Sequence, residues 1–159
     1  RMISGERLEQ LALFFNFLFD DFIVVANETQ QVLNKSSVIE SDTVLELCHN
    51  VSVNGVFYQH FIVESRTLLN EVGNLSYYMN HNDYDVVALN NGEMIVYNST
   101  HIVSGNMTLI VDHWMNVTFG VPINKTMRLF GSRTLLELTG LFGFTLDEFI
   151  VIENNTNAI

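Results

Sequence analysis

The segment from Asn106 to Val121, NMTLIVDHWMNVTFGV, constrains the fold more than any other part of the chain. Its odd-numbered positions are apolar from Met107 to Val121 except for His113, whereas most of its even-numbered positions are polar. This alternation is typical of a β-strand that has one buried face and one solvated face. Ile110 and Trp114 are apolar residues on the polar face, so we expect a helix, a sugar or a neighbouring subunit to cover them.

Together with the residues that follow it up to Thr126, this segment carries three Asn-x-Ser/Thr triplets, the acceptor motif for N-linked glycans. The chain has nine such triplets, whereas its 18 Asn, 10 Ser and 11 Thr would produce about two by chance. This excess predicts a secreted, extracellular and densely N-glycosylated protein. The predicted N-glycosylation sites are Asn27, Asn34, Asn50, Asn74, Asn98, Asn106, Asn116, Asn124 and Asn154. The alternative is an Asn-rich cytosolic protein with accidental matches.

Composition narrows the classes of partner. The net charge of -11 disfavours binding to nucleic acid and to anionic membrane surfaces. Cys48 is the only cysteine, which excludes an intrachain disulfide and a cysteine-based zinc cluster. The apolar run from Leu11 to Ala26 is interrupted by Asn16, Asp20 and Asp21, so we expect a core helix and no membrane span. The start of the chain shows no signal peptide, and we interpret the sequence as a mature form.

The length of 159 residues and the 48% content of hydrophobic residues predict a single domain, residues 1–159, with residues 154–159 as a polar tail. Apolar residues at helical spacing predict a long first helix, capped by Ser4 and extending to Phe22, and a second over residues 56–72 that stops at Gly73. Strands are expected over 43–53, on both sides of Asn91-Gly92, over 106–121, within 126–140 and over 144–153. The predicted fold is α+β, with two long helices packed on a curved, mostly antiparallel sheet of five or six strands.

The order of these elements over residues 4–153, helix, strand, helix and four hairpin-linked strands, resembles the nuclear transport factor 2-like superfamily of cone-shaped α+β proteins. The resemblance implies a pocket inside the cone, in which some members place Asp and His as catalytic groups. A different α+β sandwich also fits the same pattern.

Few residues suggest chemistry. His113 shares the apolar face of its strand, and Tyr97 and His101 have the same parity on the preceding one, so these three are the candidate pocket residues. Their other interpretation is a set of hydrogen-bonded core or interface side chains, with Tyr58 and His60 as weaker examples. No metal-ligand spacing, phosphate loop or nucleophile elbow is present, so we expect no metal, no cofactor and no enzymatic activity.

Two functions remain. In the first, the chain is a non-enzymatic structural or assembly glycoprotein that self-associates as a homo-oligomer or polymer, with extracellular fibres formed by strand or tail exchange. Three features favour it: the long apolar helix, the last strand with its NNTNAI tail as an edge for pairing, and nine acceptor sites that leave little open surface for a large partner. In the second, the chain is a secreted small-molecule carrier or receptor module that uses the interior of the cone.

Overall fold

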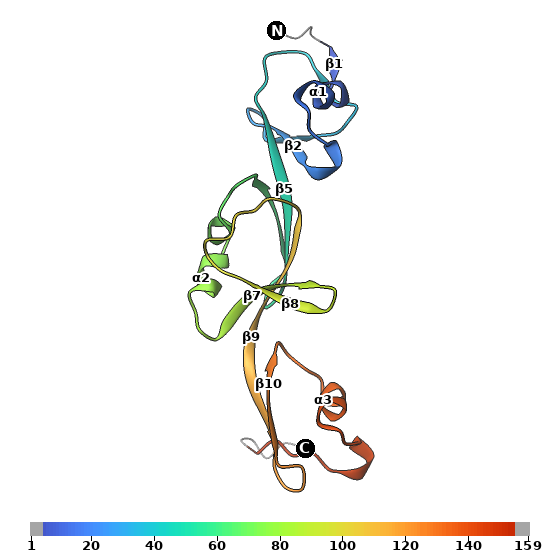
Figure 1. Cartoon of the computed structure of the whole chain (residues 1–159), viewed down its shortest axis with the longest axis vertical. Helices are drawn as coiled ribbons and strands as arrows, with labels where there is room; N and C mark the ends of the chain where they lie inside the picture. The colour runs from blue at the N-terminus through green and yellow to red at the C-terminus, as the bar shows by residue number, and fades with distance from the viewer. Residues whose placement is uncertain (1–4, 155–159) are drawn as a thin grey trace. The chain divides into compact units, whose positions relative to one another are not determined.

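The computed structural model describes residues 5–154, which fall into two compact units, Arg1–Asp112 and His113–Ile159 (Figure 1). We call them unit 1 and unit 2 and describe each by itself. The prediction of a single domain over residues 1–159 stays a prediction, and residues 155–159 of the expected polar tail lie outside the described part.

Unit 1 is built on a mixed sheet with the strand order β3-β2-β5-β9-β7-β8, and β6 also pairs with β5. β5 is parallel to β9, whereas β2, β3 and β6 join the sheet in antiparallel pairs and β8 is antiparallel to β7. The strands are β2 (Ile23–Ala26), β3 (Gln31–Leu33), β5 (Leu45–Gly55), β6 (Gln59–Glu64), β7 (Tyr84–Asn90), β8 (Glu93–Tyr97) and β9 (Met107–Phe119).

Unit 1 has two clusters of buried apolar residues, a small one of Leu8, Leu11 and Val24 and a larger one on one face of this sheet. Alternate residues of β5 and β9 are fully buried there against Leu69 and Leu75, which come from η2 (Leu69–Glu71) and α2 (Leu75–Met79). The alternation expected from the sequence is therefore confirmed on both strands. The buried residues of the larger cluster are Val51, Val53, Val63, Leu69, Val72, Leu75, Val86, Val103, Leu109 and Val111.

The first helix is much shorter than predicted. α1 covers only Leu8–Phe15, and the chain continues through η1 (Phe19–Asp21) into β2. Asn16 adopts the left-handed conformation with φ of 57° and ends the helix as its C-cap. The β-branched run Ile23-Val24-Val25 then pairs with β5. β1 (Glu6–Arg7) precedes α1 and forms a small two-stranded sheet with β4 (Val38–Ile39), which comes later in the chain. Ser4, the predicted cap, lies outside the described residues.

The prediction of a second long helix over residues 56–72 is wrong. Its first part is β6, which forms a hairpin with β5 so that Phe61 lies opposite Val51 and Val63 opposite His49. Cross-strand burial on β5 outweighs the helical spacing of residues 57, 61, 68 and 72. Only the short helices η2 and α2 follow, and Gly73 separates them with φ of 51°.

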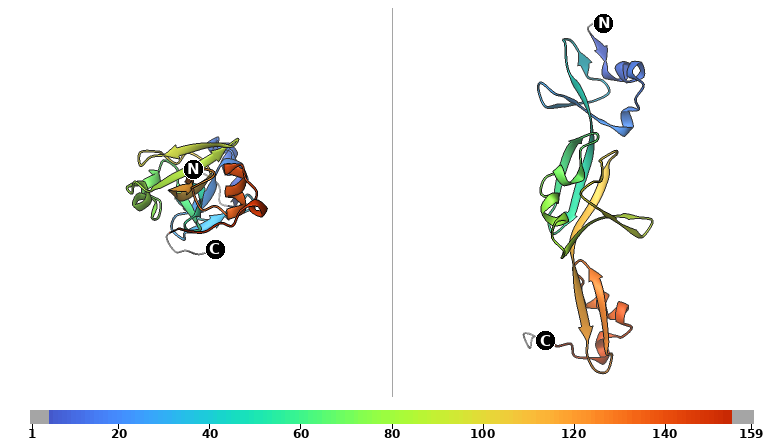
Figure 2. Two further views of the ribbon diagram at one scale, coloured as in Figure 1. Left: turned by 90° about the horizontal axis from the view of Figure 1, so that it is seen from below. Right: turned by 60° about the vertical axis from the view of Figure 1, so that its left-hand side comes forward.

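The hairpin predicted at Asn91-Gly92 is confirmed. β7 and β8 pair from Val86 and Tyr97 to Asn90 and Glu93, and they extend as a two-stranded ribbon (Figure 2). Both turn residues have positive φ, 50° and 82°, as the tight type I′ turn requires.

Unit 2 is a hairpin covered by one helix. The second part of β9 pairs with β10 (Lys125–Phe130), and α3 (Leu135–Phe142) lies beside them (Figure 1). The strand predicted within residues 126–140 is confirmed as β10, but α3 takes the rest of that range from Leu135 onward. The strand predicted over residues 144–153 is wrong, and η3 (Leu146–Glu148) lies there instead. The reason is local, because Thr134 and Glu137 form a capping box and Gly143 ends the helix with φ of 78°.

The fold is thus α+β, with a mixed multi-stranded sheet and short helices. The two long helices are not found among residues 5–154, and the cone that they were expected to cover is not confirmed. Within the same range, no helix is long and apolar enough to cross a membrane.

Candidate functional site

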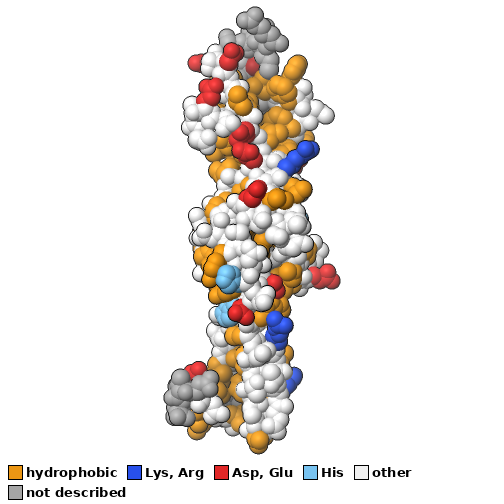
Figure 3. Space-filling model, turned by 90° about the vertical axis from the view of Figure 1, so that its left-hand side faces the viewer, with side chains coloured by type: hydrophobic (Ala, Val, Ile, Leu, Met, Phe, Trp, Pro, Cys, Tyr) orange, Lys and Arg blue, Asp and Glu red, His pale blue; other side chains and the backbone are white. Residues whose placement is uncertain are grey.

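The predicted glycan acceptors all lie at the surface of their units. Seven of the nine asparagines are exposed, and the other two, Asn27 and Asn50, are half-buried. Uncharged polar side chains and backbone, drawn in white, cover much of the face in Figure 3. The acceptor nitrogens are therefore near solvent, but their hydrogen bonding differs from site to site.

Asn34 and Asn98 form the same turn in two separate loops of unit 1. The hydroxyl of Ser36 donates to Asn34 Oδ1 at 2.8 Å, and the hydroxyl of Thr100 donates to Asn98 Oδ1 at 2.7 Å. In each turn the backbone N–H of the same Ser or Thr also donates to that oxygen, at 3.0 Å. The motif's hydroxyl and its carboxamide are thus one hydrogen bond apart on an exposed turn.

Asn50 lies in a different setting, on the central strand β5 between β6 and β9. Its backbone N–H donates to Asn106 Oδ1 at 2.8 Å, so two acceptors are direct neighbours. The hydroxyl of Ser52, the third residue of the triplet, is 2.8 Å from His60 Nδ1. The other ring nitrogen of His60 bonds to the Tyr58 hydroxyl. Sequence reasoning ranked His60 and Tyr58 low and missed this Ser52-His60-Tyr58 chain, which the β5-β6 register creates.

The two acceptor triplets of the unit 2 hairpin share one hydrogen bond. Thr118 and Thr126 are cross-strand partners, and their hydroxyl oxygens are 2.8 Å apart. They are the third residues of the Asn116 and Asn124 triplets. Asn116 itself pairs with Arg128 across the hairpin.

Trp114, the apolar exception on the glycan-bearing face, is covered from within unit 2. Its ring lies 5.2 Å from that of Phe130, its cross-strand partner, and the Arg128 guanidinium lies 4.9 Å from the ring centroid. Side chains of β10 thus pack against this residue within the unit, and cover of its remaining surface by a sugar or a subunit stays a prediction.

Asn27 is bound through its acceptor nitrogen. Its Nδ2 donates to a carboxylate oxygen of Glu46, whose neighbour Glu64 lies across the sheet from Cys48. Desolvation and the adjacent Glu64 carboxylate raise the pKa of Glu46. Burial, followed by the charges of Glu46 and Glu64, raises the pKa of the Cys48 thiol, so this cysteine is held in its unreactive protonated form.

The structure brings two of the three candidate pocket residues together. The rings of Tyr97 and His101 lie side by side in unit 1, with centroids 4.4 Å apart. His113 belongs to unit 2, where its backbone carbonyl accepts from Gly131 N–H at 2.8 Å. Among the described residues, no group of three His, Cys, Asp or Glu side chains is arranged to hold a metal.

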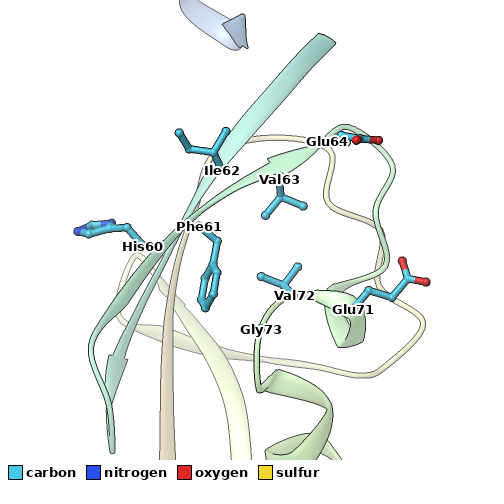
Figure 4. Close-up of a pocket in the computed structure, with 8 residues that line it drawn as sticks. All are labelled: His60, Phe61, Ile62, Val63, Glu64, Glu71, Val72 and Gly73. Carbon is cyan, nitrogen blue, oxygen red and sulfur yellow. The ribbon is translucent and has the colours of Figure 1, made fainter. Parts of the chain in front are cut away.

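A shallow, open depression of about 440 Å³ lies between β6 and the loop after η2 (Figure 4). Phe61, Val63 and Val72 point toward one another in it, and Glu64 and Glu71 lie on its other side. Its lining residues are His60, Phe61, Ile62, Val63, Glu64, Glu71, Val72 and Gly73. Its ionisable residues lie apart in this view, with His60 on the opposite side from Glu64 and Glu71 (Figure 4).

Comparison of the chain with protein-family models, curated proteins and solved structures found no match.

Proposed function

We propose that this chain is a secreted, extracellular, densely N-glycosylated protein with a structural rather than an enzymatic role. The observation that carries the proposal is the nine acceptor triplets, several times the chance number, whose asparagines all lie at the surface. Exposure is a requirement for modification, whereas the excess in number is what separates these triplets from chance.

We further propose that the protein self-associates. α1 and the segment after it expose Leu13, Phe14 and Leu18 by 83%, 72% and 71%, and in unit 2 Leu136 and Ile150 are exposed by 70% and 78%. Exposed apolar groups of this kind are common at protein-protein contacts. Strand or tail exchange into fibres remains our proposed mode, because β3 and β8 end the sheet of unit 1 and offer open edges.

The carrier or receptor module is the second candidate. It would use the depression beside β6, because the interior of unit 1 is filled by the aliphatic cluster described above. The open shape of that depression favours it less than a closed pocket would.

The proposed function is tested on protein secreted from an N-glycosylating host. Intact mass before and after enzymatic deglycosylation gives the number of glycans, and light scattering with electron microscopy gives the assembly state. A variant with Asn→Gln at all nine positions is the matched control for mass. An unchanged mass would refute glycosylation, and a monodisperse monomer over a wide concentration range would refute self-association. Deleting residues 144–159 should abolish any fibres if exchange uses this segment.

A further inference from the structure

The nine acceptors differ in what holds the third residue of their triplet. Because the motif requires a Ser or Thr at that position, a transferase must reach the hydroxyl and the Asn Nδ2 together. In the turns at Asn34 and Asn98 the hydroxyl already lies beside the Asn carboxamide, at 2.8 and 2.7 Å from Oδ1. Both turns are exposed, and each is closed by a local backbone bond, Ser37 N–H to Asn34 O and His101 N–H to Asn98 O.

The Asn50 triplet has neither property. Val51 and Ser52 have cross-strand partners on both sides, in β6 and in β9, so its backbone lies within the sheet. The Ser52 hydroxyl is directed to His60 Nδ1 and not to Asn50. Val51, the middle residue of the triplet, is fully buried. An enzyme could surround this triplet only if β5 separated from its neighbours.

The Asn116 triplet, in unit 2, is also part of a paired strand, but it has a partner strand on one side, β10, rather than on both. Val117 and Thr118 pair with Met127 and Thr126 of β10, and the Thr118 hydroxyl bonds to the Thr126 hydroxyl. Opening a paired strand costs more free energy than opening an exposed turn, and the cost is greatest for a strand that is paired on both sides, as β5 is at Asn50.

We infer that the folded chain offers Asn34 and Asn98 to an oligosaccharide transferase and withholds Asn50 and Asn116, which can be modified only before their strands pair. This inference rests on the proposed glycosylation. In the reaction, Asn Nδ2 bonds to the anomeric carbon of a lipid-pyrophosphate-linked oligosaccharide, and the bond from that carbon to the phosphate oxygen breaks. The lipid pyrophosphate leaves with the electron pair, and Nδ2 loses one proton to solvent.

The set of occupied sites therefore indicates whether glycans were added before or after folding. A glycan on Asn50 or Asn116 marks addition to an unfolded chain during or before translocation, and glycans confined to turn sites such as Asn34 and Asn98 mark addition to the folded protein.

The experiment uses the full chain, produced without glycans in a host that lacks the pathway and then folded. It is incubated with a purified single-subunit oligosaccharide transferase and its lipid-pyrophosphate-linked oligosaccharide, and occupancy is followed at each site by glycopeptide mass spectrometry. The unfolded control is the full chain with Leu109→Asp and Leu129→Asp, which place a charge in the core of each unit. Loss of its β-sheet circular dichroism verifies that it is unfolded.

In the folded chain, Asn34 and Asn98 should be modified at least about tenfold faster than Asn50 and Asn116. In the unfolded variant this ratio should fall to about one. Thr100→Ser should keep modification of Asn98, and Thr100→Ala should abolish it. Equal rates at the four sites of the folded chain would overturn the inference and leave the glycosylation proposal standing. Absence of modification at every site, in folded and unfolded chains alike, would overturn both.

Discussion

Gly55 lies where β5 meets β9, and replacing it with alanine should be among the most damaging small changes in unit 1. Its φ is +107°, and a Cβ on it would lie 2.0 Å from the carbonyl oxygen of Val111 and 2.9 Å from that residue's carbonyl carbon. Both are backbone atoms, so no side-chain rotation relieves the overlap. The two strands must move apart instead, which breaks the bond from Val56 N–H to Val111 O at 2.9 Å.

The expected loss follows from these two effects. A non-glycine residue at positive φ costs about 1–2 kcal/mol, and the broken hydrogen bond adds about 1 kcal/mol. Strain at the junction of two core strands brings the loss to at least about 3 kcal/mol. With a urea m-value of about 2 kcal/mol/M, the midpoint should fall by about 1.5 M.

Two other glycines of unit 1 separate these contributions. Gly92 has φ of +82° but no atom within 4 Å of the place where an alanine Cβ would lie, so Gly92→Ala should cost about 1 kcal/mol. Gly105 has neither positive φ nor a close neighbour, so Gly105→Ala should be neutral or stabilise by about 0.5 kcal/mol.

Urea unfolding monitored by tyrosine fluorescence is the assay. All five tyrosines lie in unit 1, and the single tryptophan, Trp114, lies in unit 2, so the two emissions report on separate units. If Gly55→Ala shifts the tyrosine midpoint no further than Gly92→Ala does, the overlap with Val111 is not a constraint on the fold and the reasoning fails.

Two further predictions concern ionisable and capping groups. Because the pKa of Glu46 is raised above its usual 4.5 in the folded state, its contribution to stability is fully present below pH 4.5 and is lost as pH rises through the folded pKa. Glu46→Gln should flatten the pH dependence of unfolding above pH 4.5, and a dependence equal to the parent's would contradict the Glu46-Glu64 interaction. Thr134→Ala removes the N-cap of α3, whose hydroxyl accepts from Glu137 N–H at 3.2 Å, and should destabilise unit 2 by about 1 kcal/mol in tryptophan-monitored urea unfolding, whereas Thr134→Ser should not.

Several elements could be predicted because their signal is local. The Asn91-Gly92 turn needs two residues that tolerate positive φ, and both are in the sequence. The alternation along β9 predicts which side chains are buried, and Leu109 and Val111 are fully buried as expected.

The helix predictions failed where a local pattern had two solutions. Phe57 and Phe61 are four residues apart, as on a helical face, yet Phe61 and Val63 also alternate as on a strand. Pairing with β5 favours the strand, because it buries Val63 and satisfies the backbone hydrogen bonds of both strands at once. The unpredicted helix α3 shows the converse, since the local capping box of Thr134 and Glu137 starts a helix within an apolar run that also fits a strand.

For the glycan acceptors, too, some properties follow from the local sequence and others from the tertiary structure. Acceptor triplets are covalent motifs of three consecutive residues, so the sequence alone determined where they are and that they outnumber chance. Which hydroxyl faces its own asparagine, as at Asn98, and which is taken by a neighbouring strand, as Ser52 is by His60, was decided only by the tertiary structure. The physical reason is that a hydrogen bond across a sheet depends on strand register, and register is set by burial of the whole strand rather than by any three residues.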